Sequence, residues 1–303
     1  MGFKFILTLI FVLILISMLI FYFTPFNIIH FVSSPKNSNF SLADGSVEMQ
    51  FYPNMRFPSN DISYKISDCN LQKENDMQYA FENMANITLL RFYPVLTHEE
   101  ISITCQEKNR YDNGMFVAGE GGPINITVAR NFDIITKGEI LLIKNSNCPN
   151  PNVATHELLH VLGFKHSTNP NNIMYNVTDC GQTISNDVIQ LINELYSTPS
   201  YPDLILENVS GIMKGRFLEI NFSVMNGGFR DSAEFNVTIY AGDKLVEKVD
   251  LQALQIGYGR FISMENIWVP QMNVNKITIN ADSYFEEITK ENNKVILEIK
   301  PQN

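Results

Sequence analysis

Three of the five histidines of this chain occur close together, as His156, His160 and His166. On an α-helix, positions i and i+4 share a face, so His156 and His160 can direct both rings to one point. Gly163 permits the left-handed turn that ends a helix, and such a turn would return the chain and bring His166 to the same point. The spacing therefore predicts a short helix that ends near Gly163 and three imidazoles around one metal ion.

The residues around these histidines indicate which chemistry such a site could support. Three neutral nitrogen ligands leave a fourth tetrahedral position for water, which is typical of a catalytic zinc site rather than a closed structural one. Glu157 could take the proton of a zinc-activated water as it attacks a peptide carbonyl, and then protonate the leaving amine. An accidental His-Glu-x-x-His on an ordinary amphipathic helix is the alternative for the short motif alone. Gly163 and His166, at their fixed spacing, favour the metal site.

The full pattern His-Glu-x-x-His-x-x-Gly-x-x-His, followed by Met174-Tyr175, resembles the signature of the metzincin metalloproteases. Ser167, directly after the third histidine, and the run at 172–175 are similar to the matrixins in particular. The similarity extends from about residue 55 to residue 198.

The matrixin resemblance implies a zinc metalloendopeptidase with one catalytic ion and protein or peptide substrates. The implied site consists of Glu157 as the catalytic base, His156, His160 and His166 as metal ligands, and Met174 and Tyr175 in the turn beneath the metal. In this family the edge strand before the active-site helix binds the substrate by strand addition. The substrate-binding residues implied here are Ile124, Asn125, Ile126, Thr127 and Val128. A role for calcium stays undetermined.

Three departures from the family pattern limit what the resemblance implies. Only His30 and His98 lie outside the histidine cluster, so the second, histidine-built zinc of vertebrate matrixins is not expected. No cysteine precedes Cys69, so a cysteine-switch prodomain is not expected either. Asn176 stands where the family usually has a proline after Met-Tyr, so the substrate preference of the family does not carry over.

The four cysteines are even in number and none forms a Cys-x-x-Cys spacing, so we expect two disulfides formed in an oxidising environment. Of the three possible pairings we favour Cys69–Cys105 and Cys148–Cys180, because the second pair would brace the chain before and after the metal site. Four buried thiols in a reducing compartment are the alternative.

The order of elements between residues 54 and 200 predicts an α+β domain with a mixed twisted sheet and three helices, as in the matrixins. A strand is expected at 61–67, followed by a helix, and a last helix is expected near 188–196. The apolar face of the first helix consists of Met77, Ala80, Phe81 and Met84. Further strand-like runs cover 88–92, 100–104, 124–129 and 139–143.

Residues 201–303 contain short runs in which apolar and polar residues alternate, separated by turn residues. This pattern predicts an all-β sandwich. The segments 203–209, 222–228 and 286–293 resemble the CARDB domain, an immunoglobulin-like module of prokaryotic surface proteins. Since this region has no cysteine and no histidine, no metal or nucleophile site is expected in it.

Residues 5–23 form an apolar run without a charged residue, preceded by Lys4. At ~1.5 Å per residue the run just spans a ~30 Å hydrocarbon core. We therefore expect residues 1–29 to be a single-pass membrane anchor, residues 30–53 a linker, and the catalytic domain to lie outside the cell. A cleaved signal sequence, and hence a secreted protein, is the alternative.

The net charge of −10 argues against a nucleic-acid partner, whose phosphates require a basic face. The leading hypothesis is an endopeptidase that acts on extracellular or cell-surface proteins. The alternatives are a surface adhesion or binding protein whose metzincin domain does not cleave, and a hydrolase of small cell-wall peptides. The oligomeric state is not predicted.

Overall fold

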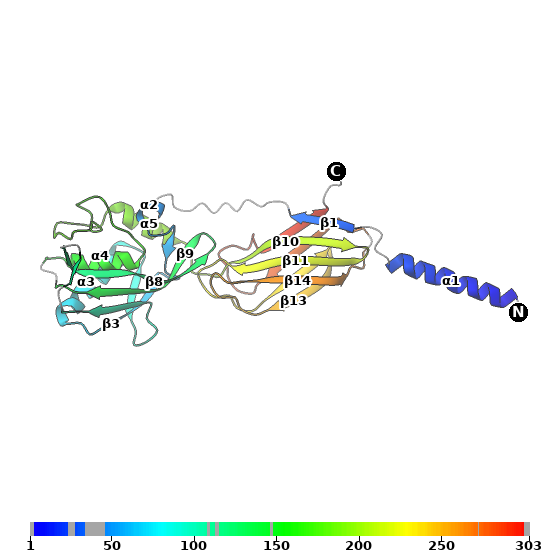
Figure 1. Ribbon diagram of the computed structural model, residues 1–303, viewed down its shortest axis with the longest axis horizontal. Helices are drawn as coiled ribbons and strands as arrows, with labels where there is room; N and C mark the ends of the chain where they lie inside the picture. Colours follow the sequence, from blue (N-terminus) through cyan, green and yellow to red (C-terminus); the bar gives the residue numbers. More distant parts are fainter. Residues whose placement is uncertain are drawn as a thin grey trace.

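The computed structural model describes residues 3–23, 28–33, 46–107, 110–112, 115–145, 148–271 and 273–299. These residues form an N-terminal helix, α1 (Phe3–Phe23), and two folded units that lie end to end (Figure 1). The first unit is α+β and the second is all-β, as the sequence predicted.

The first unit is built on a mixed sheet. Its strands are β2 (Met55–Arg56), β3 (Asp61–Ser67), β4 (Arg91–Pro94), β5 (Ile101–Cys105), β8 (Gly119–Ala129) and β9 (Phe132–Leu142), and a small separate pair consists of β6 (Arg110–Asp112) and β7 (Met115–Val117). Strands β2, β9, β5, β3 and β4 are parallel neighbours in that order. Strand β8 pairs antiparallel with β9 and forms the sheet edge on that side.

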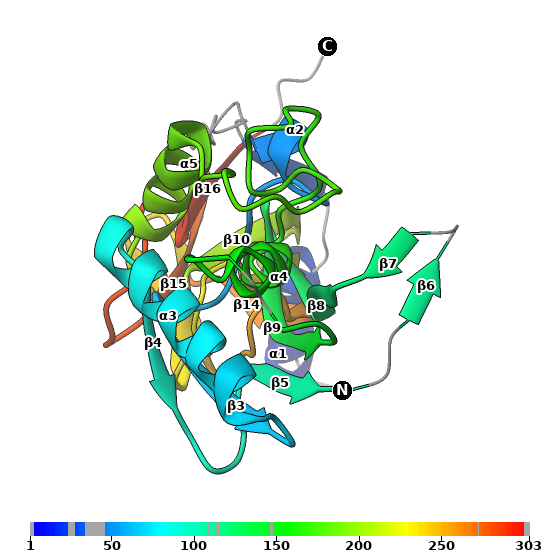
Figure 2. The same cartoon turned by 90° about the vertical axis from the view of Figure 1, so that its left-hand side faces the viewer.

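Four helices accompany this sheet in the part of the chain that the structure describes, where the sequence predicted three. They are α2 (Ser46–Met49), α3 (Leu71–Ile87), α4 (Asn152–Val161) and α5 (Asn186–Ser197). The additional helix, α2, is a single turn, and one turn is too short for a 3.6-residue apolar period to show in the sequence. Figure 2 shows α4 at the centre of this unit, with α3 and α5 to one side and α2 above.

Helix α3 follows its sequence signals closely. It begins after Asn70, whose side chain accepts a hydrogen bond from the backbone N–H of Lys73 at 3.0 Å and so satisfies one of the free donors of the first turn. Its buried face includes the predicted set of Met77, Ala80, Phe81 and Met84. The predicted amphipathic helix is therefore present in this region.

The second unit is an antiparallel sheet of eight strands, in the order β13-β12-β15-β16-β1-β10-β11-β14. Its strands are β1 (Ile28–Ser33), β10 (Leu204–Lys214), β11 (Phe217–Asn226), β12 (Phe235–Ala241), β13 (Lys244–Leu251), β14 (Gly259–Trp268), β15 (Lys276–Asp282) and β16 (Lys294–Ile299). In β11 every second side chain is buried, which is the period that a strand with one core face requires.

Strand β1 was not predicted. It lies between β10 and β16 and pairs antiparallel with both, and Phe31 packs into the core of the second unit. Residues 30–33, at the start of the predicted linker, are therefore part of a sheet, whereas residues 34–45 of that linker lie outside the described residues. The partners of β1 lie more than 170 positions away in the sequence, so no local sequence pattern predicts the pairing.

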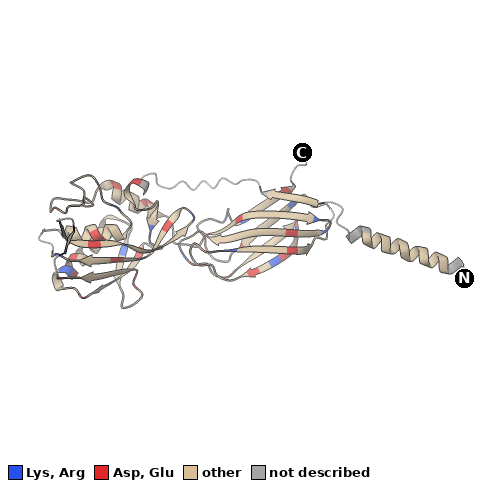
Figure 3. Cartoon of the chain, viewed as in Figure 1, with Lys and Arg blue, Asp and Glu red and all other residues tan. Residues whose placement is uncertain are grey.

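The predicted membrane anchor is not supported. The described side chains of α1, from Phe5 to Ile20, include no charged residue (Figure 3). Among the described residues, however, no helix is both long and apolar enough to cross a membrane. The expectation of a single-pass N-terminal anchor was wrong on this finding.

The two units share a packed interface. Phe229, from the second unit, belongs to the hydrophobic core of the first. Its ring meets Phe132 edge to face, with centroids 4.7 Å apart, and lies 4.1 Å from the guanidinium carbon of Arg56. Arg56 also donates hydrogen bonds to the backbone oxygens of Leu195 and Thr198. An aromatic side chain of the second unit thus covers a buried cation of the first.

Candidate metal centre

Helix α4 ends where the sequence predicted. Gly163 has φ of +95°, a conformation that favours glycine, and its N–H donates to the carbonyl of His160 at 2.9 Å. Packing also requires a glycine at this position, because a Cβ at Gly163 would lie 2.7 Å from Cβ of Met55. The turn therefore reverses the chain directly after the helix and directs residues 164–166 back along it.

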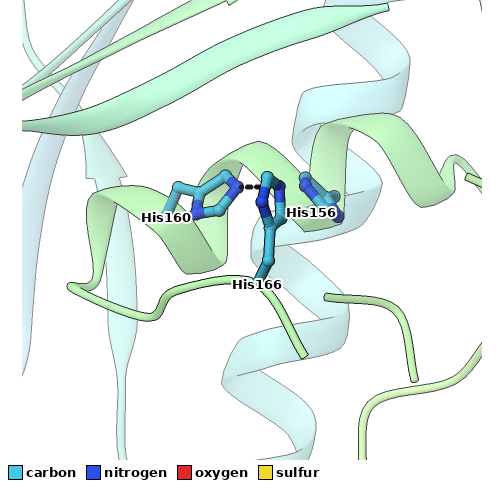
Figure 4. Close-up of side chains that lie close together, drawn as sticks. All are labelled: His156, His160 and His166. Atoms are coloured by element: carbon cyan, nitrogen blue, oxygen red, sulfur yellow. Dashed lines mark hydrogen bonds between the residues drawn. The ribbon is translucent and has the colours of Figure 1, made fainter. Parts of the chain in front are cut away.

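The three histidines converge. One ring nitrogen from each of His156, His160 and His166 lies within 4.8 Å of the others, and Nε2 of His160 is 3.2 Å from Nε2 of His166. Figure 4 shows His156 and His160 on the helix and His166 reaching toward them from the loop. His156 and His160 are buried, whereas His166 is exposed, so the cluster opens to solvent on the side of the loop.

Backbone carbonyls orient the two helical rings. Nδ1 of His156 lies 2.6 Å from the carbonyl oxygen of Ile173, and Nδ1 of His160 lies 2.7 Å from that of Phe164. A carbonyl can only accept, so each Nδ1 must carry the proton and each Nε2 keeps its lone pair for the centre of the cluster.

The protonation of the histidines also fits a metal ion. Burial lowers the pKa of His156, and burial together with the neighbouring His156 lowers the pKa of His160 to about 4. Burial lowers the pKa of His166 as well. The imidazoles are therefore neutral at pH 7, which is the form that binds metal. Three neutral nitrogen donors with an open side match the donor set of a catalytic zinc ion.

Glu157 belongs to α4, and its side chain lies against β8. Its side chain is 5% exposed, and burial, with a smaller contribution from the carboxylate of Glu120, raises its pKa to about 8. A Cβ at Gly119 would lie 2.8 Å from Oε1 of Glu157, so only a glycine lets β8 approach this carboxyl group. A carboxyl group with such a pKa can both accept and donate a proton near neutral pH, as a general acid-base residue must.

The pKa of Glu157 predicts how the stability of the metal-free protein depends on pH. The folded state keeps the Glu157 proton up to about pH 8, whereas the unfolded chain loses it near the ordinary value of 4.5. The stability that the bound proton of Glu157 gives the folded state is therefore fully present below pH 4.5 and is lost as the pH rises through about 8. With excess chelator, the free energy of unfolding in urea should fall in the parent between about pH 4.5 and pH 8 and level off above that, and this fall should be absent in Glu157→Gln. Parallel curves for the two proteins would contradict the assignment.

Strand β8 contains the predicted substrate-binding residues, but its contact with α4 lies elsewhere. Ile124 to Val128 occupy the second half of the strand, and Ile124 and Val128 are exposed. The segment that faces Glu157 is Gly119–Gly121, which the sequence analysis did not include because three glycines in four positions show no strand alternation. At the far end of β8, Gly257 of the second unit packs against Val128. Substrate binding by residues 124–128 stays a prediction.

Gly121 and Gly122 offer a matched pair of substitutions on this edge. A Cβ at Gly121 would lie 2.4 Å from the backbone oxygen of Glu157, whereas a Cβ at Gly122 would meet nothing within 4 Å. Gly121→Ala must push β8 away from α4, so we expect a loss of about 1–3 kcal/mol in the free energy of unfolding. Gly122→Ala should lie close to the parent. Urea unfolding of the two variants checks this. Equal free energies of unfolding would show that β8 can move away from α4 without loss of stability.

The loop after α4 is held under the cluster. The backbone N–H of Ser167 donates to the carbonyl of Met174 at 2.8 Å, and Met174 is buried. The side chain of Asn172 accepts from the N–H of Met174 at 2.8 Å and donates to Ser185 at 2.8 Å. Asn172 had no predicted role of its own, although an asparagine two positions before Met174 is a typical turn residue. Tyr175 forms a bridge with Ser167, so the predicted turn lies next to the third histidine.

Both predicted disulfides are confirmed, as Cys69–Cys105 and Cys148–Cys180. The first joins the segment after β3 to the end of β5. The second joins the segment before α4 to the loop that follows Met174, so it ties together the two chain segments on either side of the histidine cluster, as the sequence analysis expected.

This fold and site define a metallopeptidase-like domain followed by an all-β domain. The matrixin family model matches residues 56–197, and the CARDB family model matches residues 201–296, so both resemblances seen in the sequence are confirmed. No curated protein matched the chain.

Two solved structures are similar to the second unit. One is the CARDB domain of a protein from Pyrococcus furiosus, in complex with di-metal ions, with 19% identity over 33% of this chain and 92% of that chain and a TM-score of 0.28. The other is a domain of a putative cell surface protein from Methanosarcina acetivorans, with 20% identity over 34% of this chain and 95% of that chain and a TM-score of 0.27.

Proposed function

We propose that this chain is a zinc-dependent endopeptidase with one catalytic ion held by His156, His160 and His166. The observation that carries the proposal is the convergence of three neutral imidazoles, two of them oriented by backbone carbonyls, with the buried Glu157 directly after His156 on the same helix. Zinc bound there would supply an activated water and would polarise the scissile carbonyl.

The chain's own residues supply proton transfer and substrate alignment. Glu157 would accept a proton on its carboxylate and pass it to the leaving amine, as a general acid-base residue does. Strand β8 is an edge strand, so its free backbone groups can pair with an extended peptide. Since Gly119–Gly121 of β8 pack on α4 at Glu157, a peptide added to β8 would pass close to that carboxyl group. This arrangement supports a polypeptide substrate bound in extended form.

We infer that the protein works outside the reducing cytoplasm. Its four described cysteines form two disulfides, which persist in oxidising compartments. Secretion, the alternative weighed for the N-terminal apolar run, agrees with this inference. Extracellular proteins or peptides would then be the substrates.

The proposal is tested on zinc-loaded full chain with a denatured protein substrate. We expect one zinc ion per chain, cleavage that a chelator stops and added zinc restores, and loss of both zinc and cleavage in His160→Ala. Zinc binding without cleavage of proteins or peptides would instead favour an adhesion protein with a non-cleaving site. Cleavage of short cell-wall peptides alone would favour the small-peptide hydrolase.

A further inference from the structure

The third histidine is anchored differently from the other two. Nδ1 of His156 and Nδ1 of His160 each bind a backbone carbonyl, but within the described residues the structure gives Nδ1 of His166 no such partner. His166 also lies on a loop rather than on the helix. The position of its ring must therefore depend on how the backbone on either side of it is held.

One side of His166 is held by the turn that contains Met174, through Ser167. The other side is held by a segment from the start of the first unit, residues 49–55, which we name the N-terminal strap. The N–H of Lys165, directly before His166, donates to the carbonyl of Met49 at 2.9 Å. The N–H of Phe51 donates to the carbonyl of Gly163 at 2.9 Å, and Gln50 forms an antiparallel bridge with Phe164. The strap thus pairs with the chain between the helix and the third ligand.

The strap is itself closed and buried at its base, so it can act as a support. The side chain of Gln50 is 1% exposed, donates to the carbonyl of Met55 at 2.8 Å and accepts from the N–H of Met55 at 3.0 Å. Met55 is fully buried against Gly163. One amide side chain therefore closes the loop from Gln50 to Met55, which contacts the turn that follows α4.

The strap also contacts a helical ligand directly. The ring of Phe51 stacks on the imidazole of His160, with centroids 5.8 Å apart and planes 25° from parallel. This geometry lies within the range of an offset-stacked aromatic pair. Phe51 is 44% exposed, so its ring contributes little to the core, and its contact with the imidazole is the more specific feature.

We propose that the N-terminal strap is a positioning element of the metal centre: its backbone sets the place of His166, and Phe51 keeps the ring of His160 in the orientation that binds metal. The proposal rests on the proposed zinc function of the same three histidines. Phe51 and Gln50 are positioning residues, since they act through the ligands and their neighbours. Removing such outer contacts typically weakens metal binding by 10–100-fold.

The test compares Phe51→Ala, Phe51→Tyr and Tyr52→Ala in the full chain. Tyr52 is the adjacent aromatic residue and is exposed, so Tyr52→Ala is the matched control. We expect Phe51→Ala to bind zinc about tenfold more weakly in competition with a chromophoric chelator. We also expect Phe51→Ala to alter the visible spectrum of the Co²⁺-loaded protein. Without metal, Phe51→Ala and Tyr52→Ala should have the same melting temperature. Phe51→Tyr, which retains the ring, should recover the parent affinity and spectrum.

A second variant tests the backbone part of the strap. Gln50→Ala removes both hydrogen bonds to Met55 and should weaken zinc binding by a similar factor, even where its metal-free stability also falls. The proposal is overturned if Phe51→Ala and Gln50→Ala match Tyr52→Ala in zinc affinity and in the Co²⁺ spectrum. If the parent chain binds no zinc at all, the proposed function fails first, and that outcome is distinguishable because it appears before any variant is compared.

Discussion

Glu157→Gln is expected to lower kcat/KM for a protein substrate by roughly 10²–10⁴-fold while one zinc ion per chain is still bound. Glutamine has nearly the same shape, so it can occupy the buried space between α4 and β8, but it cannot accept and return a proton. Because the three histidines are untouched, zinc content and chelator competition should match the parent. The expected signature is therefore a loss of turnover without a loss of metal.

A suitable control is Glu194→Gln on α5, which makes the same chemical change at an exposed side chain far from the cluster in sequence. Its kcat/KM should equal that of the parent. Cleavage of a quenched fluorescent peptide and of denatured casein measures both variants. Unchanged turnover in Glu157→Gln would show that another group moves the proton, and would remove Glu157 from the proposed mechanism.

Phe229→Ala is expected to lower the free energy of unfolding by about 3–5 kcal/mol, the usual cost of deleting a buried phenylalanine. The ring is 1% exposed and packs on Phe132 and on the guanidinium of Arg56. Its loss opens a cavity and also uncovers a cation whose pKa burial lowers to about 10. Since the residue belongs to the second unit but packs in the core of the first, the substitution should destabilise both units.

Phe261→Ala is the matched control, because Phe261 belongs to the same unit and is 67% exposed. Urea unfolding, followed by fluorescence and by circular dichroism, should give one shared transition for the parent and for the control. In Phe229→Ala we expect a lower midpoint. A midpoint equal to that of Phe261→Ala would mean that the two units do not stabilise one another through this contact.

The sequence determined the histidine cluster and the local elements to a large extent. His156 and His160 are four positions apart on one helix, and the helix end at Gly163 is required both by φ and by the lack of space for a Cβ. The four buried positions of α3 follow from a helical period. Both disulfides were predicted from the position of Cys148 and Cys180 around the histidine cluster. In each case the information lies within a few residues, or in one spacing along the chain.

Local patterns failed where segments were short or where partners lay far away. Helix α2 is one turn long, and β1 joins a sheet whose other strands follow more than 170 positions later. The apolar run at the N-terminus predicted a membrane anchor, but no described helix meets the length and apolarity that a span requires. The run at 119–121 contains too many glycines to read as a strand, although those glycines let β8 approach Glu157.

The histidine motif by itself therefore determined which imidazoles converge, because helix geometry and a glycine turn act over a dozen residues. Only the tertiary structure decided what holds them there. Strap residues Met49 and Phe51 reach the loop before His166 from more than 100 positions away, and Phe229 of the second unit joins the hydrophobic core of the first. Such contacts depend on how distant segments pack, and packing between distant segments leaves no periodic trace in the residues that make it.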